Sequence, residues 1–131
     1  MTTVSAETEA LLRRTYEAFN RKDIEAVLAV MTTDVNWPNM LDRVRVIGHD
    51  AVRAYWRDQF ARIDPSVEPT AFALDSDGNV VVSVHQVIRN LEGRLLVDLH
   101  VQHVYMLRGG LVAAMDVRDQ AGALLSAPRA T

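Results

Sequence analysis

Three turns that contain glycine divide the C-terminal half of the chain, and they restrict its fold more than any other feature. They are Ser76-Asp77-Gly78, Glu92-Gly93 and Gly109-Gly110. The segments between them are rich in valine and leucine and have the length of β-strands. Turns of this kind join adjacent antiparallel strands. The pattern therefore predicts a four-stranded antiparallel meander at about residues 67–74, 80–90, 94–108 and 111–119.

The N-terminal half shows helical periodicity instead. Apolar residues recur at helical spacing in two stretches, first Leu12, Tyr16 and Phe19, then Ile24, Val27, Leu28 and Met31. Asp23 is placed to cap the second helix. After a short strand at 35–37, a third helix is expected from Gly48 until Pro65, with Val52, Trp56, Phe60 and Ile63 facing inward. The chain is thus expected to be α+β, with three N-terminal helices packed on the sheet.

Turn geometry predicts which strand residues face one another. A three-residue loop at the first turn, with Gly78 left-handed, directs Phe72 and Leu74 inward. A two-residue second turn places Val82 opposite His103 and makes one sheet face almost wholly apolar. The same rule at Gly109-Gly110 places Asp116 opposite His103. The inner face is therefore expected to carry a histidine beside an aspartate.

Such a pair can carry proton-transfer chemistry. A carboxylate that accepts from one imidazole nitrogen leaves the other nitrogen free to move protons. His103 and Asp116 are accordingly the predicted catalytic residues. Either of the two could be the base, because protons on a coupled pair belong to the pair. The alternative interpretation is a core histidine that happens to have Asp116 as its partner.

Other polar and aromatic residues are predicted to line the same pocket, because the helices and the short strand must cover this face. They are Tyr16, Trp37, Asn39, Trp56, Tyr105 and Arg118. Tyr105 is the strongest of these, since it lies two residues from His103 and has a hydroxyl that needs a partner if buried. Arg118 could contact an anionic substrate group. The alternative is that the aromatic residues are plain core and that Arg118 is solvated.

Three segments resemble the nuclear transport factor 2-like superfamily, especially its SnoaL-like branch, which includes ketosteroid isomerase-like proteins. They are YEAFNRKDIEAVLAVMTTDVNW, GHDAVRAYW and HVYMLRGGLVAAMDV. The resemblance implies a cone in which three helices cover a strongly bent sheet, with a pocket for small molecules. It also implies a catalytic aspartate on the last strand at Asp116. The ketosteroid isomerase tyrosine and acids fall instead on Thr15, Asn39 and His103, so that mechanism is not expected.

Composition excludes several other classes. The 131 residues suit one domain, expected to have its core at about 5–120 and a flexible tail at 121–131. There is no cysteine, and no signal peptide or membrane span is evident, so we expect a cytoplasmic protein. A net charge of -3 with scattered basic residues argues against nucleic acid as a partner. No metal site is expected, because His100 and His103 point to opposite faces of a strand.

Together these observations favour a cofactor-free enzyme that acts by proton transfer on a small, largely apolar carbonyl compound. Isomerase, cyclase and lyase reactions remain equally open. The alternatives are a binding protein without activity and a dimeric scaffold. A homodimer is expected through the outer sheet face, which carries valines and methionines along with His85 and His100.

Overall fold

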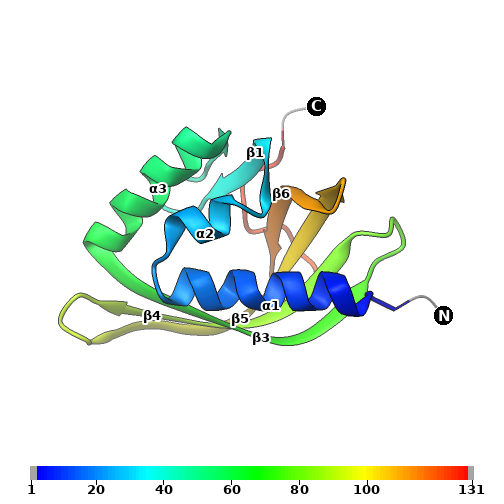
Figure 1. Ribbon diagram of the computed structural model, residues 1–131. Helices are drawn as coiled ribbons and strands as arrows, with labels where there is room; N and C mark the ends of the chain where they lie inside the picture. The colour runs from blue at the N-terminus through cyan, green and yellow to red at the C-terminus, as the bar shows by residue number, and fades with distance from the viewer. Residues whose placement is uncertain (1–2, 130–131) are drawn as a thin grey trace.

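A computed structural model describes residues 3–129 and shows three helices on one side of a six-stranded curved sheet (Figure 1). The elements in chain order are α1 Ala6–Asn20, α2 Ile24–Leu28, β1 Met31–Asn39, β2 Val44–Ile47, α3 His49–Arg62, β3 Ile63–Leu74, β4 Val80–Asn90, β5 Leu95–Arg108 and β6 Leu111–Arg118. The strand order across the sheet is β2-β1-β6-β5-β4-β3. The α+β class predicted from the sequence is confirmed.

The first two helices begin as their sequences indicate. The Ser5 side chain accepts from the backbone N–H of Thr8 at 3.1 Å, and Asp23 caps α2 by accepting from Ala26 at 3.2 Å. The expected role of Asp23 is thus confirmed. The second helix is shorter than predicted, however, because it ends at Leu28 and Met31 already belongs to β1.

The third helix follows two strands instead of one short strand. β1 is longer than the predicted strand at 35–37, and β2 was not predicted at all. The helix begins after Gly48, whose φ of 88° suits glycine, and ends at Arg62. Ile63 and Pro65 lie at the start of β3 and not in the helix.

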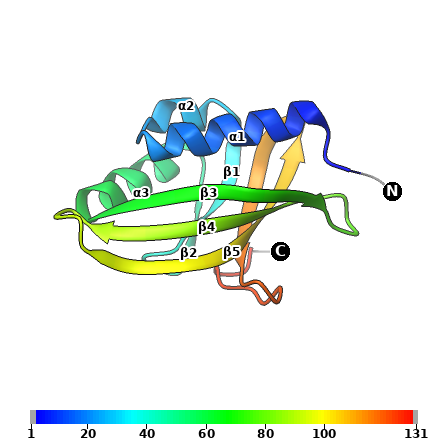
Figure 2. The ribbon, with the colours of Figure 1, turned by 90° about the horizontal axis from the view of Figure 1, so that it is seen from below.

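The sheet is antiparallel except at one junction. β3, β4, β5 and β6 pair antiparallel as predicted, and Figure 2 shows the long strands β3 to β5 lying side by side beneath the helices. β1, however, pairs with β6 in parallel, so the prediction of a purely antiparallel sheet was wrong. This pairing joins β1 and β2 to the meander, and α3 packs on β1, β2 and β3.

The first two hairpins give the predicted pairs. Phe72 faces Val82 across the three-residue loop, in which Gly78 has φ 80°. The second loop also has three residues, since the backbone N–H of Asn90 donates to Arg94, and so the two-residue turn was wrong. A register shift beyond Ile88 compensates, and His103 faces Val82 as predicted.

The third hairpin departs from the prediction. Its turn pairs Leu107 with Val112, but the register then shifts and leaves Ala113 without a partner on β5. His103 consequently faces Val117, and Asp116 faces Val104 on the other side of the sheet. The predicted His103–Asp116 pair does not form. A bulge reverses the facing of every later residue on its strand, and here it directs Val117 to the core and the carboxylate away from it.

The C-terminal segment packs against β6. Its Leu125 donates to the carbonyl of Val117 at 2.8 Å, and the Ser126 hydroxyl accepts from the Val117 N–H at 3.0 Å. The flexibility expected of the tail at 121–131 stays a prediction, and residues 130 and 131 of that tail lie outside the described part. Within residues 3–129, no helix is long and apolar enough to cross a membrane.

Candidate functional site

A cavity of about 470 Å³ lies between the helices and the concave face of the sheet. Most of the side chains that line it are apolar or aromatic. Five of the residues predicted for the site line it, namely Tyr16, Trp37, Trp56, His103 and Tyr105. The three other predicted residues, Asn39, Asp116 and Arg118, are not among the lining residues.

A chain of three buried polar side chains interrupts the apolar lining. The Tyr16 hydroxyl, from α1, lies 2.8 Å from Nδ1 of His103 on β5. The Tyr105 hydroxyl, two residues further along β5, donates to the Tyr16 oxygen at 2.8 Å. The imidazole stacks beside the Tyr16 ring with centroids 5.8 Å apart, while Tyr105 meets Tyr16 edge-on. The first helix thus brings Tyr16 to two residues of β5 that follow it by 87 and 89 positions in the sequence.

Burial keeps this chain uncharged at neutral pH. Loss of hydration lowers the pKa of His103 from 6.5 to about 4, so the imidazole is neutral. Burial likewise raises the pKa of Tyr16 and of Tyr105, and both stay protonated. With Tyr105 donating to Tyr16 and Tyr16 donating to Nδ1, the histidine hydrogen is assigned to Nε2. No hydrogen bond from Nε2 to another residue within 3–129 is present, which leaves this N–H available to a ligand.

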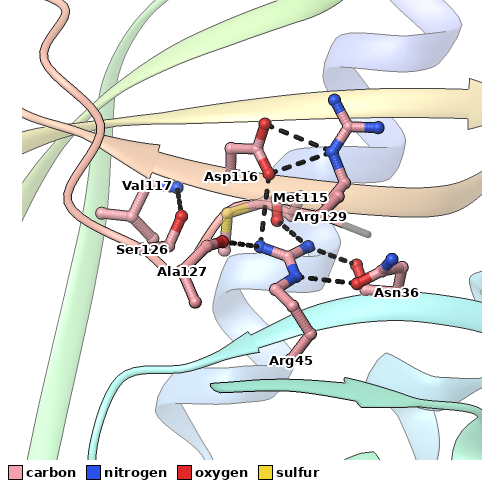
Figure 3. Close-up of polar contacts among 8 residues, drawn as sticks. All are labelled: Asn36, Arg45, Met115, Asp116, Val117, Ser126, Ala127 and Arg129. Atoms are coloured by element: carbon pink, nitrogen blue, oxygen red, sulfur yellow. Dashed lines mark hydrogen bonds and ion pairs between the residues drawn. The ribbon is translucent and has the colours of Figure 1, made fainter. Parts of the chain in front are cut away.

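Asp116 has a different environment, on the outer side of the sheet (Figure 3). Its carboxylate accepts from Arg45 Nη1 at 3.2 Å and from Arg129 Nε at 3.2 and 3.4 Å. The Arg45 and Asp116 side chains are 9% and 8% exposed, so this is a buried ion pair. Arg45 also donates to both backbone and side-chain oxygens of Asn36 and to the Met115 carbonyl. Asp116 therefore joins β2, β6 and the C-terminal segment, and it does not reach the cavity.

The two remaining predicted residues also have structural surroundings. The Asn39 side-chain oxygen accepts from the backbone N–H groups of Leu41 and Asp42 at 3.0 and 2.9 Å, which holds the turn after β1. Arg118 lies opposite Gln102 on the outer side of the sheet, and its Nε has no partner among the described residues. Neither side chain contributes to the cavity wall.

Sequence reasoning missed two polar residues of the cavity on α3. The Tyr55 hydroxyl accepts from Gln59 Nε2 at 3.2 Å and from the Met40 backbone N–H at 3.2 Å. Their i, i+4 spacing was a signal that both lie on one helix face, but the neighbouring Trp56 dominated the apolar pattern. The missing carboxylate is equally informative: no aspartate or glutamate lines the cavity within residues 3–129. That part of the chain also has no cluster of three histidine or carboxylate side chains that could hold a metal ion.

Comparison with solved structures supports the architecture. A nuclear transport factor 2-like protein of unknown function from Burkholderia pseudomallei is 26% identical with a TM-score of 0.74, over 88% of this chain and 92% of that one. The epoxide hydrolase/cyclase-like enzyme SalBIII, of pyran ring formation in salinomycin, is 17% identical with a TM-score of 0.71, over 88% and 92%. A Mycobacterium tuberculosis protein in complex with estradiol-17β-hemisuccinate is also 17% identical with a TM-score of 0.71, over 85% and 92%.

Sequence comparison gives the family. The curated proteins contain no match to this chain. The family described as the SnoaL-like domain matches residues 12–115, which include more than half of α1 and most of the sheet. This span contains all three residues of the buried polar chain. The protein therefore belongs to the SnoaL-like domain family, within the nuclear transport factor 2-like fold.

Proposed function

We propose that the protein is a cofactor-free enzyme of the cyclase or isomerase type, which acts on a small, largely apolar carbonyl compound by proton transfer at His103. The observation that carries this proposal is the Tyr105–Tyr16–His103 chain inside an otherwise apolar cavity. Membership of a family with cyclase-like structural relatives supports the same reaction type. Asp116 has no part in it, because its carboxylate is bound by Arg45 and Arg129.

The imidazole can act in two directions. In the arrangement described above, water or hydroxide from solvent takes a proton from the carbon next to a carbonyl group, and Nε2–H donates to the carbonyl oxygen and stabilises the negative charge that develops there. In the reverse arrangement, Nδ1–H donates to Tyr16, Tyr16 donates to Tyr105, and the free lone pair of Nε2 accepts the proton. Because the pKa of His103 is about 4, this base is weak and suits an acidic carbon, such as one between two carbonyl groups.

Proton transfer can be tested before the natural product is known. A panel of aryl 1,3-diketones is incubated with the protein in deuterated water, and exchange at the central carbon is followed by NMR. Wild-type protein is expected to accelerate the exchange, and His103→Asn to lose about 10²- to 10⁴-fold of the acceleration. Asp116→Asn is the matched control and should keep it. Equal acceleration by wild type and His103→Asn would refute the proposed role of His103.

A binding protein without activity is the second candidate. The absence of a carboxylate from the cavity wall, within residues 3–129, favours it, because the site then lacks a strong base. It predicts that the diketones bind with no exchange in any member of the panel. The structural relative that is in complex with estradiol-17β-hemisuccinate supports binding of an apolar compound by this candidate. Identification by mass spectrometry of whatever copurifies would name the ligand in either case.

We further propose a homodimer through the outer sheet face, in the cytoplasm. Cross-strand pairing supports one part of that surface, since His85 and His100 stack there with centroids 4.6 Å apart and His85 bonds to Asp98. The apolar part is smaller than expected, because Met115 and Val117 line the cavity. Sedimentation equilibrium tests the proposal, and a monomer at all concentrations would reject it.

A further inference from the structure

One arginine stands at the wall of the cavity. Arg43 lies in the turn between β1 and β2, is exposed, and is the one charged side chain among the described lining residues if the neutral His103 is set aside. No ion pair joins it to any other residue within 3–129. We infer that Arg43, together with Tyr55 and Gln59, binds an anionic group of the ligand. This inference rests on the proposed function and narrows its substrate to a carbonyl compound that also carries an acidic group.

The turn that carries Arg43 is held in place from two sides. Asn39 accepts from two backbone N–H groups within it, and the Met40 N–H donates to the Tyr55 hydroxyl. Arg43 itself has φ 56°, in the left-handed region that non-glycine residues seldom adopt. Such a conformation persists when the surroundings impose it, and it is concentrated at ligand sites. The backbone from which the Arg43 side chain extends is therefore held by a fixed turn and not by a loose loop.

The neighbouring polar groups on α3 have unused hydrogen-bonding capacity. The Tyr55 oxygen already accepts two hydrogen bonds, so its own hydrogen remains free to donate. Gln59 is 8% exposed, and its Oε1 has no partner among the described residues. If the amide is turned over, Oε1 accepts from Tyr55 and Nε2 becomes the unpaired donor. In both arrangements at least one donor, the Tyr55 hydroxyl or an Nε2–H of Gln59, is left for an oxygen of the ligand. In the second arrangement that oxygen also pairs with a buried amide N–H that would be costly to leave unpaired.

Two charged residues, Asp42 and Arg43, are neighbours in this turn, and only Arg43 lines the cavity. Asp42 is the nearest acidic neighbour in sequence, but its carboxylate accepts from Asn39 Nδ2 at 3.3 Å and does not line the cavity. A ligand anion at Arg43 would therefore meet a cation and the donors of Tyr55 and Gln59, with no carboxylate in the described wall. Burial, and to a smaller extent the charge of Asp42, raises the pKa of Tyr55, so the hydroxyl keeps the hydrogen that it would donate. Apolar binding energy would come from the aromatic side chains, and the charged contact would orient the ligand with its carbonyl group toward His103.

A pair of fluorescent compounds separates the charge from the apolar body. 1-Anilinonaphthalene-8-sulfonate and N-phenyl-1-naphthylamine share the same aromatic frame, and only the first carries an anion. We expect wild-type protein to bind the sulfonate more tightly. Arg43→Gln should weaken the sulfonate by about two- to fivefold, the range for an exposed ion pair, and leave the neutral amine unchanged. Arg43→Lys should restore part of the difference, and high salt should remove it.

The control is Arg14→Gln, which removes a positive charge that is also exposed but lies on α1 and is not part of the cavity lining. It should leave both affinities unchanged. Binding of the neutral amine with no effect of Arg43→Gln on the sulfonate would overturn the inference while leaving the proposed function intact. Failure of both compounds to bind would overturn the proposed function as well, because the cavity would then not accept apolar ligands.

Discussion

The two faces of the sheet at β5 and β6 both bury polar side chains, but they use them differently. On the cavity face, His103 and two tyrosines form a neutral chain that leaves the Nε2–H of the imidazole without a partner. On the outer face, Arg45 directs its five N–H donors to five oxygens, of which one belongs to Asp116. The outer cluster is thus saturated, whereas the cavity chain has spare capacity. A ligand in the apolar cavity can bind to this unused hydrogen-bond donor.

The largest effect is expected on the outer face. Arg45→Met should lower the free energy of unfolding by about 3–5 kcal/mol, because it leaves the Asp116 carboxylate buried with less compensation. Arg129→Met is the matched control. Its side chain is 42% exposed, so its contact with the same carboxylate should contribute less than about 1 kcal/mol. Urea denaturation of both variants at neutral pH measures the difference. Equal losses would mean that the cluster is not organised around Arg45.

The next effect concerns pH and the cavity face. Because the folded pKa of His103 is about 4 and the unfolded value about 6.5, the unfolded chain takes up this proton first as the pH falls. Stability from this residue is therefore complete above pH 6.5 and is lost between pH 6.5 and 4. Between pH 7 and 5 the loss should be about 2 kcal/mol. Urea denaturation measures the free energy of unfolding at both pH values. The difference between the two values should be smaller by about 2 kcal/mol in His103→Asn than in wild type. An equal difference in both proteins would contradict a buried, neutral His103.

A smaller effect tests the direction of the hydrogen bonds in the chain. Tyr16→Phe removes the middle hydroxyl and leaves both its donor and its acceptor without a partner, so it should cost about 1–2 kcal/mol. Tyr105→Phe removes only the terminal donor and should cost about 0.5–1 kcal/mol. Thermal or urea denaturation of the two variants gives the order. A loss of about 1–3 kcal/mol in Tyr105→Phe would mean that the chain runs in the reverse direction, because the buried hydrogen of Tyr16 would then have lost its acceptor.

Much of this arrangement follows from local pattern, and the parts that do not have identifiable causes. Alternation of apolar residues and the position of Gly78 are enough to place His103 on the inner face. The turn at Glu92-Gly93 is one residue longer than predicted, but the register shift beyond Ile88 cancels this error. No such cancellation occurs at Ala113, where one unpaired residue moves Asp116 to the other face. A bulge adds one residue without a strong sequence signal, and its position depends on tertiary packing.

The side of α1 that faces the cavity is a second place where local sequence pattern is not enough. Tyr16 was predicted to line the pocket, but its hydrogen bond to His103 spans 87 residues and no local pattern reports such a contact. β2 and its Arg45 were missed because four residues are too short for a clear alternation. The sequence therefore does not indicate that Arg45 and Arg129 bind the Asp116 carboxylate on the face away from the cavity.

The smallest expected effect is the sharpest test of the comparison between the two faces. Asp116→Asn keeps an oxygen for Arg45 and Arg129 but removes the charge, so some stability should be lost. Ligand affinity should change by less than about twofold, because the side chain does not line the cavity. Titration of the folded variant with N-phenyl-1-naphthylamine and with the sulfonate measures this. A large loss of affinity or of diketone exchange in a variant that remains folded would return Asp116 to the site, and the two faces would then have to be treated as one coupled system.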